Sequence, residues 1–226
     1  MSEPRQVFRR PPSESWLVLS GLVPSLDAEM PQMAEQLLSR LDLSRMPICL
    51  LGDDSIGDEL QSFLDDIEIL LNSPVTVIRI NELTQNTFRE IVETANILVM
   101  VGGDVQSWIN VLDPLKSEIE VDDLLGGGRL VFTVGSASSS LGSWIFSGDE
   151  EPAAGLGWLT GAIVLPEVEK PGEIPIVKQL LSQHKLSYAL GLPRGAVLAL
   201  GPRGEIEVWG IASPSVVLGV AWGESE

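Results

Sequence analysis

The chain has 226 residues, 44% of them hydrophobic, and its 32 acidic against 14 basic residues give a formal net charge of −18 at pH 7. A chain of this length and composition can bury one sizeable core and needs no second domain. The negative charge argues against nucleic acid and anionic membranes as partners, because both bind to a basic face. The sequence leaves open whether the chain forms a homo-oligomer.

The N-terminal segment and the cysteine content favour a cytoplasmic protein. Residues 1–15 contain Arg and Pro but no apolar core of signal-peptide length, and no later apolar run approaches the roughly 20 residues of a membrane span. The single cysteine, Cys49, cannot form an intrachain disulfide, and its apolar surroundings predict a buried strand position. We therefore expect a flexible lead over 1–15 and one α/β domain over 16–226.

Strands and helices alternate along the first half of this domain. Short apolar runs predict strands at 16–19, 47–51, 75–80 and 97–101. Apolar residues at helical spacing predict helices over 30–41, 60–71, 86–94 and 108–115. Such alternation indicates a parallel sheet with helices on both faces, which is the α/β class.

The C-terminal third changes in character. A strand at 162–165 and a helix at 176–184 are followed by short β-type runs at 196–200, 205–209 and 215–221. Gly and Pro turns separate these runs, and Gly201-Pro202-Arg203-Gly204 is the clearest hairpin signal. The pattern predicts a small antiparallel β extension at the C-terminus.

The stretch from Arg129 to Gly142, RLVFTVGSASSSLG, predicts a strand that breaks at a glycine into small hydroxylated residues and then a helix. This is typical of a nucleophile elbow, because only small residues fit its sharp turn and its helix directs N–H groups toward developing negative charge. A Ser-rich turn that caps a helix gives the same pattern. The strand at 97–101 ends in a second turn, Gly102-Gly103-Asp104, which we expect at the same carboxyl edge of the sheet.

Four blocks in this order resemble the dipeptidase E and cyanophycinase family of serine peptidases. VMVGGDVQSWINVL is similar to the family's strand, GGD/GGN turn and helix, and VFTVGSASSSLG to its GTSAGA elbow. GLGWLTGAIVLPE resembles the GLG segment that leads to the catalytic histidine, and GLPRGAVLAL resembles the block before the terminal strands. The resemblance runs from Trp16 onward and implies a class I glutamine amidotransferase-like, flavodoxin-like fold.

The resemblance leaves two alignments of the elbow open. With the Ser-Ala pair held fixed, Ser136 stands at the nucleophile and Ser138, an alternative hydroxyl, replaces the elbow glycine. With the preceding glycine held fixed, Ala137 falls on the nucleophile and the hydroxyl is lost. We take Ser136 as the candidate nucleophile. The family's oxyanion hole then maps to backbone N–H groups of the Gly102-Gly103-Asp104 turn and of Ala137.

Other positions depart from the family's pattern. Glu167 follows Pro166 where the family has its histidine, and a carboxylate of pKa about 4.3 is a much weaker base than an imidazole of about 6.5. Arg194 occupies the family's glutamate position and is a candidate contact for an acidic ligand. The one histidine, His184, lies well past the family's position near the end of a predicted helix, where histidines usually pack or contact the last carbonyls.

The sequence therefore supports two functions. The first is a catalytically degenerate member of the family that binds a small peptide or amino-acid-like ligand at the strand carboxyl edge. The second is an active cytoplasmic serine peptidase that hydrolyses small acidic or modified peptides with Ser136 and an unidentified base. No metal or cofactor is expected, because the acidic clusters lack calcium-loop spacing, His and Cys are too few for zinc, and GGGR at 126–129 is not a phosphate loop.

Overall fold

A computed structural model describes residues 8, 10, 14–26, 41, 44–52, 57–115, 126–146, 152–184 and 186–222. All structural statements below concern these residues. The helix expected over 30–41 lies outside them apart from Leu41.

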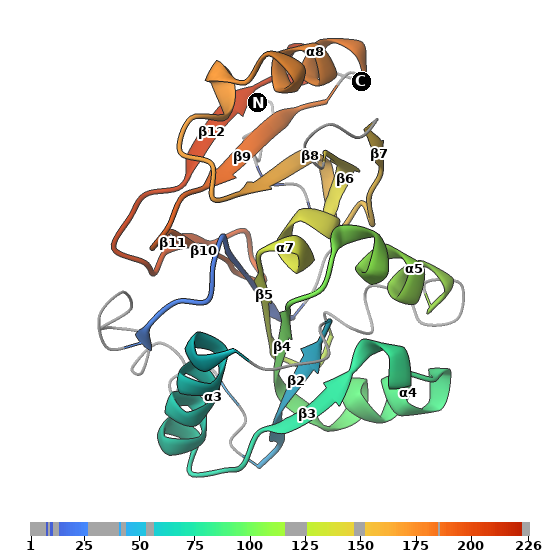
Figure 1. Ribbon diagram of the computed structural model, residues 1–226, viewed down its shortest axis with the longest axis vertical. Coiled ribbons are helices and arrows are strands. Elements are labelled where there is room, and N and C mark those ends of the chain that lie inside the picture. Colours follow the sequence, from blue (N-terminus) through green and yellow to red (C-terminus); the bar gives the residue numbers. More distant parts are fainter. Residues whose placement is uncertain are drawn as a thin grey trace.

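A seven-stranded central sheet has the strand order β11-β10-β1-β5-β4-β2-β3 (Figure 1). Strands β1, β5, β4, β2 and β3 are parallel to their neighbours in this group. The bounds of these parallel strands are β1 Trp16–Ser20, β2 Met46–Leu51, β3 Thr76–Arg79, β4 Ala95–Val101 and β5 Leu130–Val134. The prediction of a mostly parallel sheet is confirmed, because apolar runs that are buried on both faces form its centre.

Helices cover both faces of the central sheet, as the sequence predicted (Figure 1). Helix α3 (Asp58–Leu71) packs an apolar stripe that includes Phe63 on one face, together with Val18 of β1. On the other face lie α4 (Gln85–Thr94), α5 (Val105–Leu115) and the short α7 (Ser136–Ser140). No helix in the described part of the chain combines the length and apolarity that crossing a membrane requires.

A second sheet of five strands, in the order β12-β9-β8-β6-β7, lies beyond α7 (Figure 1). Its strands are β6 Gly142–Ile145, β7 Ala153–Ala154, β8 Leu159–Pro166, β9 Tyr188–Leu192 and β12 Ser215–Leu218. Helix α8 (Pro175–Gln183) covers the outer face of this sheet. The sequence reading missed β6, β7 and β9, because strands this short and interrupted by glycine give little periodic signal.

The predicted antiparallel C-terminal strands are confirmed, and the structure divides them between the two sheets. Strands β10 (Val197–Leu200) and β11 (Ile206–Val208) extend the central sheet, β10 running antiparallel to β1. Strand β12 instead pairs antiparallel with β9 in the second sheet. Each C-terminal strand pairs with the edge of a sheet that earlier strands have formed. Which edge it joins depends on the tertiary fold rather than on local sequence.

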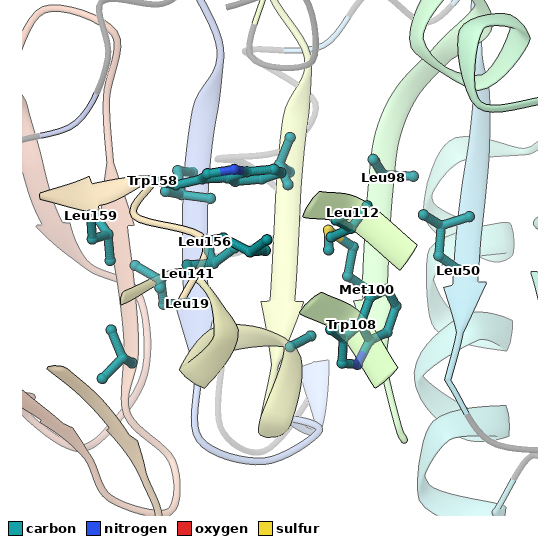
Figure 2. Close-up of a cluster of buried hydrophobic side chains, with 14 of the residues drawn as sticks. Leu19, Leu50, Leu98, Met100, Trp108, Leu112, Leu141, Leu156, Trp158 and Leu159 are labelled. Carbon is teal, nitrogen blue, oxygen red and sulfur yellow. The ribbon is translucent and has the colours of Figure 1, made fainter. Parts of the chain in front are cut away.

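The main core fills the layer between the two sheets. It contains Leu19 of β1, Met100 of β4, Trp108 of α5, and Trp158 and Tyr188 of the second sheet region, all of them buried. Figure 2 shows the side chains of Leu19, Met100, Trp108 and Trp158 within this cluster. Because Ala137 and Leu141 belong to the same core, α7 is held firmly between the sheets.

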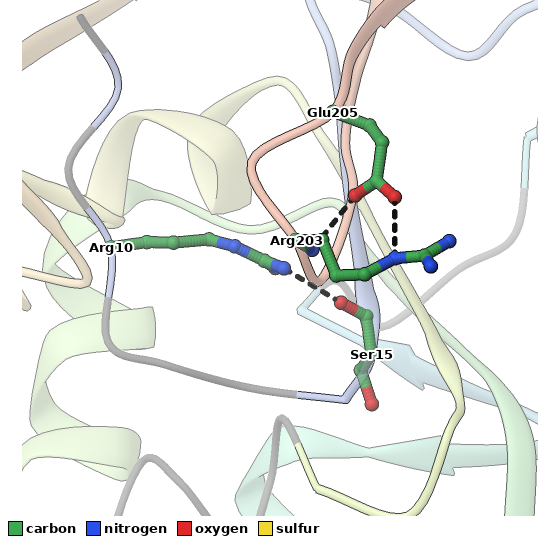
Figure 3. A network of polar contacts seen from close by, with 4 residues as sticks. All are labelled: Arg10, Ser15, Arg203 and Glu205. Carbon is green, nitrogen blue, oxygen red and sulfur yellow. Dashed lines mark hydrogen bonds and ion pairs between the residues drawn. The ribbon is translucent and has the colours of Figure 1, made fainter. Parts of the chain in front are cut away.

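Two described residues of the N-terminal lead make defined contacts. The Phe8 ring packs edge-on against Tyr188, with ring centroids 5.3 Å apart. Arg10 donates a hydrogen bond from Nη2 to the Ser15 carbonyl at 2.9 Å, near the ion pair of Arg203 with Glu205 (Figure 3). Burial lowers the pKa of Arg10, and the charge of Glu205 offsets part of that shift. Phe8 therefore packs on the domain, whereas the hydrogen bond of Arg10 stays within the lead.

Candidate functional site

The junction between β5 and α7 is a single residue, Gly135. Strand β5 ends at Val134, α7 begins at Ser136, and Gly135 between them has φ 59° and ψ −122°. Side chains are rarely found with this backbone conformation, which costs on the order of 1–3 kcal/mol for residues other than glycine. Space is nevertheless present, because the nearest atom to a Cβ built on Gly135 would be the Gly21 carbonyl oxygen at 3.6 Å. The junction therefore has the strained strand-to-helix geometry of a nucleophile elbow but carries no side chain.

Ser136, the predicted nucleophile, is the first residue of α7 and is half-buried. Its Oγ lies 2.7 Å from the carbonyl oxygen of Gly103 and 3.1 Å from that of Gly102, and the hydroxyl donates to them. The elbow and the glycine turn thus meet at one edge of the sheet, as predicted. A carbonyl oxygen accepts this hydrogen bond but is not a base that can remove the proton, so these contacts do not activate Ser136.

The other hydroxyls of the elbow are buried and point into the protein. Ser138 Oγ lies 2.9 Å from Thr133 Oγ1 and donates to the Ser20 carbonyl at 3.0 Å. Ser139 donates to the Val164 carbonyl at 3.0 Å, and Ser140 donates to the Ala137 carbonyl at 2.8 Å. A substrate cannot reach Ser138, which is fully buried, without opening the core. These hydroxyls satisfy backbone carbonyls where the chain turns sharply.

The glycine turn is fixed by close backbone contacts. Gly102 and Gly103 have φ values of 75° and 69°, and Trp108 donates from Nε1 to the Gly102 carbonyl at 2.7 Å. A Cβ on Gly52, at the end of β2, would lie 2.5 Å from that same carbonyl oxygen, so only glycine fits there.

Asp104, the third residue of the turn, caps helix α5. Its carboxylate accepts from the Ser107 backbone N–H at 2.8 Å and from the Ser107 hydroxyl at 2.7 Å. The backbone and side-chain hydrogen bonds from Ser107 lower the pKa of the Asp104 carboxyl. The side chain is therefore directed at its own helix, in the usual position of an N-cap aspartate.

Glu167, which the sequence resemblance aligns with a histidine, lies near the elbow. It follows β8 with φ 59°, and its N–H donates to the Leu192 carbonyl at 2.8 Å. A Cβ on Gly21 would lie 3.0 Å from the Glu167 nitrogen, and the Gly21 carbonyl oxygen would lie 3.6 Å from a Cβ on Gly135. Gly21 therefore lies between the junction and Glu167, so the fold brings these two segments together. The Glu167 side chain is exposed.

His184 and Arg194 contact residues outside the junction. His184 ends helix α8 and stacks on Trp144 with ring centroids 3.8 Å apart, in the cluster on the outer face of the second sheet. Arg194 is exposed, pairs with Glu59 at 3.8 Å and lines a cavity of about 330 Å³ beside α3. Asp58 and Asp66 also line that cavity, so acidic groups surround this arginine.

Cys49 is buried in β2 as predicted, and burial raises the pKa of its thiol to about 12. It stays protonated and inert near neutral pH. In the described ranges no group of three His, Cys, Asp or Glu side chains is arranged to hold a metal ion.

Sequence reasoning missed the importance of Gly135 and Gly21. Both alignments of the elbow placed the nucleophile at position 136 or 137, whereas the junction itself falls at 135. The available signal was the glycine at which the apolar run breaks, because an elbow nucleophile occupies the turn directly after its strand.

These features define a class: an α/β protein with a strand-to-helix elbow, a glycine turn at the same edge of the central sheet and a second sheet. No family model matches the chain, and no curated protein matches its sequence. Among solved structures, a peptidase from an acI-B1 Actinobacterium has a TM-score of 0.67 at 18% identity, over 96% of this chain and 95% of that one. A candidate peptidase E protein from Listeria monocytogenes EGD-e has a TM-score of 0.61 at 10% identity, over 88% of this chain and 99% of that one. The resemblance predicted from the sequence is confirmed at the level of the fold.

Proposed function

We propose that the chain is a catalytically degenerate relative of the dipeptidase E and cyanophycinase-like peptidases that binds a small peptide or amino-acid-like ligand without hydrolysing it. The observation that carries this proposal is Gly135 at the strand-to-helix junction. An elbow presents its nucleophile from that residue, and glycine has no side chain to present. Fold alone does not imply activity, so the absence of a side chain at residue 135 carries more weight than the peptidase-like fold.

Glu167 supports the same conclusion. It occupies the position beside Gly21 where the resembling peptidases have a histidine, and its exposed carboxylate is a weak base. Gly135 and Glu167 together remove both partners of the proton transfer that activates a serine. The single cysteine, Cys49, is buried and forms no disulfide, which supports a reducing cytoplasmic location.

The ligand would lie at the carboxyl edge between the elbow and the glycine turn. Backbone N–H groups are independent of side-chain identity, so the residue types at 135 and 167 do not affect the donors of Gly103 or of the residue after the junction, which is Ser136 rather than Ala137 once the junction is at Gly135. Such donors bind a carboxylate or amide oxygen, which fits an amino-acid-like ligand.

A fluorophosphonate probe with intact-mass readout tests the proposal. We expect no adduct on the folded wild-type protein, and none on Ser136→Ala. The double variant Gly135→Ser/Glu167→His restores a hydroxyl and an imidazole at the two positions, and we expect it to acquire one adduct at position 135. Room for the new side chain exists, since only the Gly21 carbonyl comes within 4 Å of its Cβ.

A wild-type adduct at Ser136 that disappears in Ser136→Ala would establish the alternative function, an active peptidase of small acidic or modified peptides. The half-buried Ser136 hydroxyl beside Gly103 is the observation that favours this alternative. A folded double variant that stays unlabelled would contradict the assignment of Gly135 to the nucleophile position.

A further inference from the structure

A second cavity, of about 240 Å³, opens at the same edge of the central sheet but outside different strands. Its polar lining consists of Gly52 at the end of β2, Arg79 and Asn81 at the end of β3, and Ser107 and Asn110 of α5. In strand order the glycine turn after β4 separates this cavity from the elbow after β5. We call it the Arg79 cavity.

The strand connections explain why the sheet opens there. After β2 the chain crosses to α3 on one face, and after the neighbouring β4 it crosses to α5 on the other face. Adjacent strands whose connections diverge leave a crevice outside their carboxyl ends, and open α/β sheets bind ligands in such crevices. The Arg79 cavity lies against this divergence, with α5 forming its wall.

The charge of the lining distinguishes the Arg79 cavity from the cavity beside α3. Its described lining has one cation, three neutral polar side chains and no carboxylate, although the chain as a whole carries −18. The Asp104 carboxylate lies next to this lining, where it accepts from the Ser107 hydroxyl at 2.7 Å. The cavity beside α3 is lined by Asp58, Glu59 and Asp66. Glu82 lies 3.8 Å from Arg79, but the two side chains are 48% and 61% exposed, so solvent screens this pair.

We propose that the Arg79 cavity binds a small anionic metabolite through a carboxylate or phosphate group. The Arg79 guanidinium supplies charged donors, and the side-chain amides of Asn81 and Asn110 supply neutral ones. The Ser107 hydroxyl already donates to Asp104, so it is available to a ligand only as an acceptor. A volume of about 240 Å³ corresponds to roughly eight water molecules, which excludes a dinucleotide and suits a small acid. This inference is independent of the proposed function, because the residues concerned are not those of the elbow.

Isothermal titration with three probes, L-aspartate, citrate and inorganic phosphate, tests the proposal. We expect saturable binding of at least one probe with Kd below about 1 mM, and the carboxylate and phosphate arms identify which anion is preferred. Arg79→Gln should weaken binding at least about tenfold, because the charged donor is lost. Asn110→Leu should weaken it about threefold to tenfold. Both residues are exposed, so neither variant threatens the fold.

Two further variants serve as controls. Arg203→Gln removes an exposed arginine that pairs with Glu205 elsewhere, and we expect unchanged binding. Glu82→Gln removes the acid beside Arg79, and binding should stay equal or tighten. Absence of saturable binding for all three probes, or equal binding by wild type and Arg79→Gln, would overturn the inference. Loss of binding in Gly135→Ser/Glu167→His but not in Arg79→Gln would overturn it as well, since the probe would then lie at the elbow.

Discussion

The elbow has a buried layer, which we call its underside, and an outer layer, which we call its top, and the residues of the two layers have different roles. The underside consists of Thr133, Ser138, Ser139 and Ser140, which are buried and hydrogen-bonded. The top consists of Gly135, Ser136 and Glu167, which are half-buried or exposed and include two residues with positive φ. The underside stabilises the turn, whereas the top is where catalytic side chains would stand.

This difference teaches that the buried layer, and not the exposed one, fixes the backbone of the turn. Glu167 holds a positive φ that is unfavourable for a residue other than glycine, whereas Gly135 adopts its positive φ without strain, and the packed layer below keeps both in place. Substitutions should therefore affect stability strongly below the elbow and weakly above it.

The largest effect is expected for Trp108→Ala. Trp108 is fully buried in the main core, and its indole N–H binds the Gly102 carbonyl, so the change leaves both a cavity and an unpaired acceptor. We expect a loss of about 3–5 kcal/mol in the free energy of unfolding, measured by urea denaturation. Trp108→Phe keeps most of the packing and should lose less. A loss below about 1 kcal/mol for Trp108→Ala would show that the core does not support the turn.

Ser138→Ala should have the next largest effect. It removes a buried hydroxyl that contacts Thr133 and the Ser20 carbonyl, and we expect a loss of about 1–3 kcal/mol in urea denaturation. Ser136→Ala is the matched variant at the top of the elbow, where water can replace the lost contact, and should cost less. The reverse order of these two losses would contradict the distinction between underside and top.

Asp104→Ala should cost about 1 kcal/mol at neutral pH, because the variant loses the N-cap of α5. The pKa of Asp104 is lowered by folding, so its contribution is present above the unfolded pKa of about 3.9 and is lost as pH falls through the lower folded value. Urea denaturation should therefore show wild type and variant converging in strong acid. Asp104→Asn keeps an uncharged acceptor, and its stability relative to Asp104→Ala should not depend on pH. A gap between wild type and Asp104→Ala that is independent of pH would contradict the carboxylate cap.

Glu167→Gly should have the smallest effect, and a stabilising one. Glycine adopts the positive φ of this position without strain, so thermal unfolding should show a gain of about 0.5 kcal/mol. Glu167→Ala keeps a Cβ and should give no gain. A clear loss of stability in Glu167→Gly would mean that the carboxylate itself stabilises the fold. Glu167 would then belong to the stabilising underside of the elbow rather than to its top.

The sequence by itself determined the α/β class, the strand and helix order from β2 through α5, and the presence of an elbow. These features depend on periodicity and on turn residues, which are local properties. It also predicted that the Gly102-Gly103-Asp104 turn and Ser136 share one edge, because parallel strands place their carboxyl ends together.

Only the tertiary structure decided which residue stands at the junction, and which edges the C-terminal strands join. Small residues in a row allow several alignments, and the strand end at Val134 that selects Gly135 is fixed by pairing of β5 with β1 and β4. The approach of Gly21 to both Gly135 and Glu167, and the opening of the Arg79 cavity, likewise arise from segments far apart in the sequence. Such contacts form only when the sheets pack, so no local pattern encodes them.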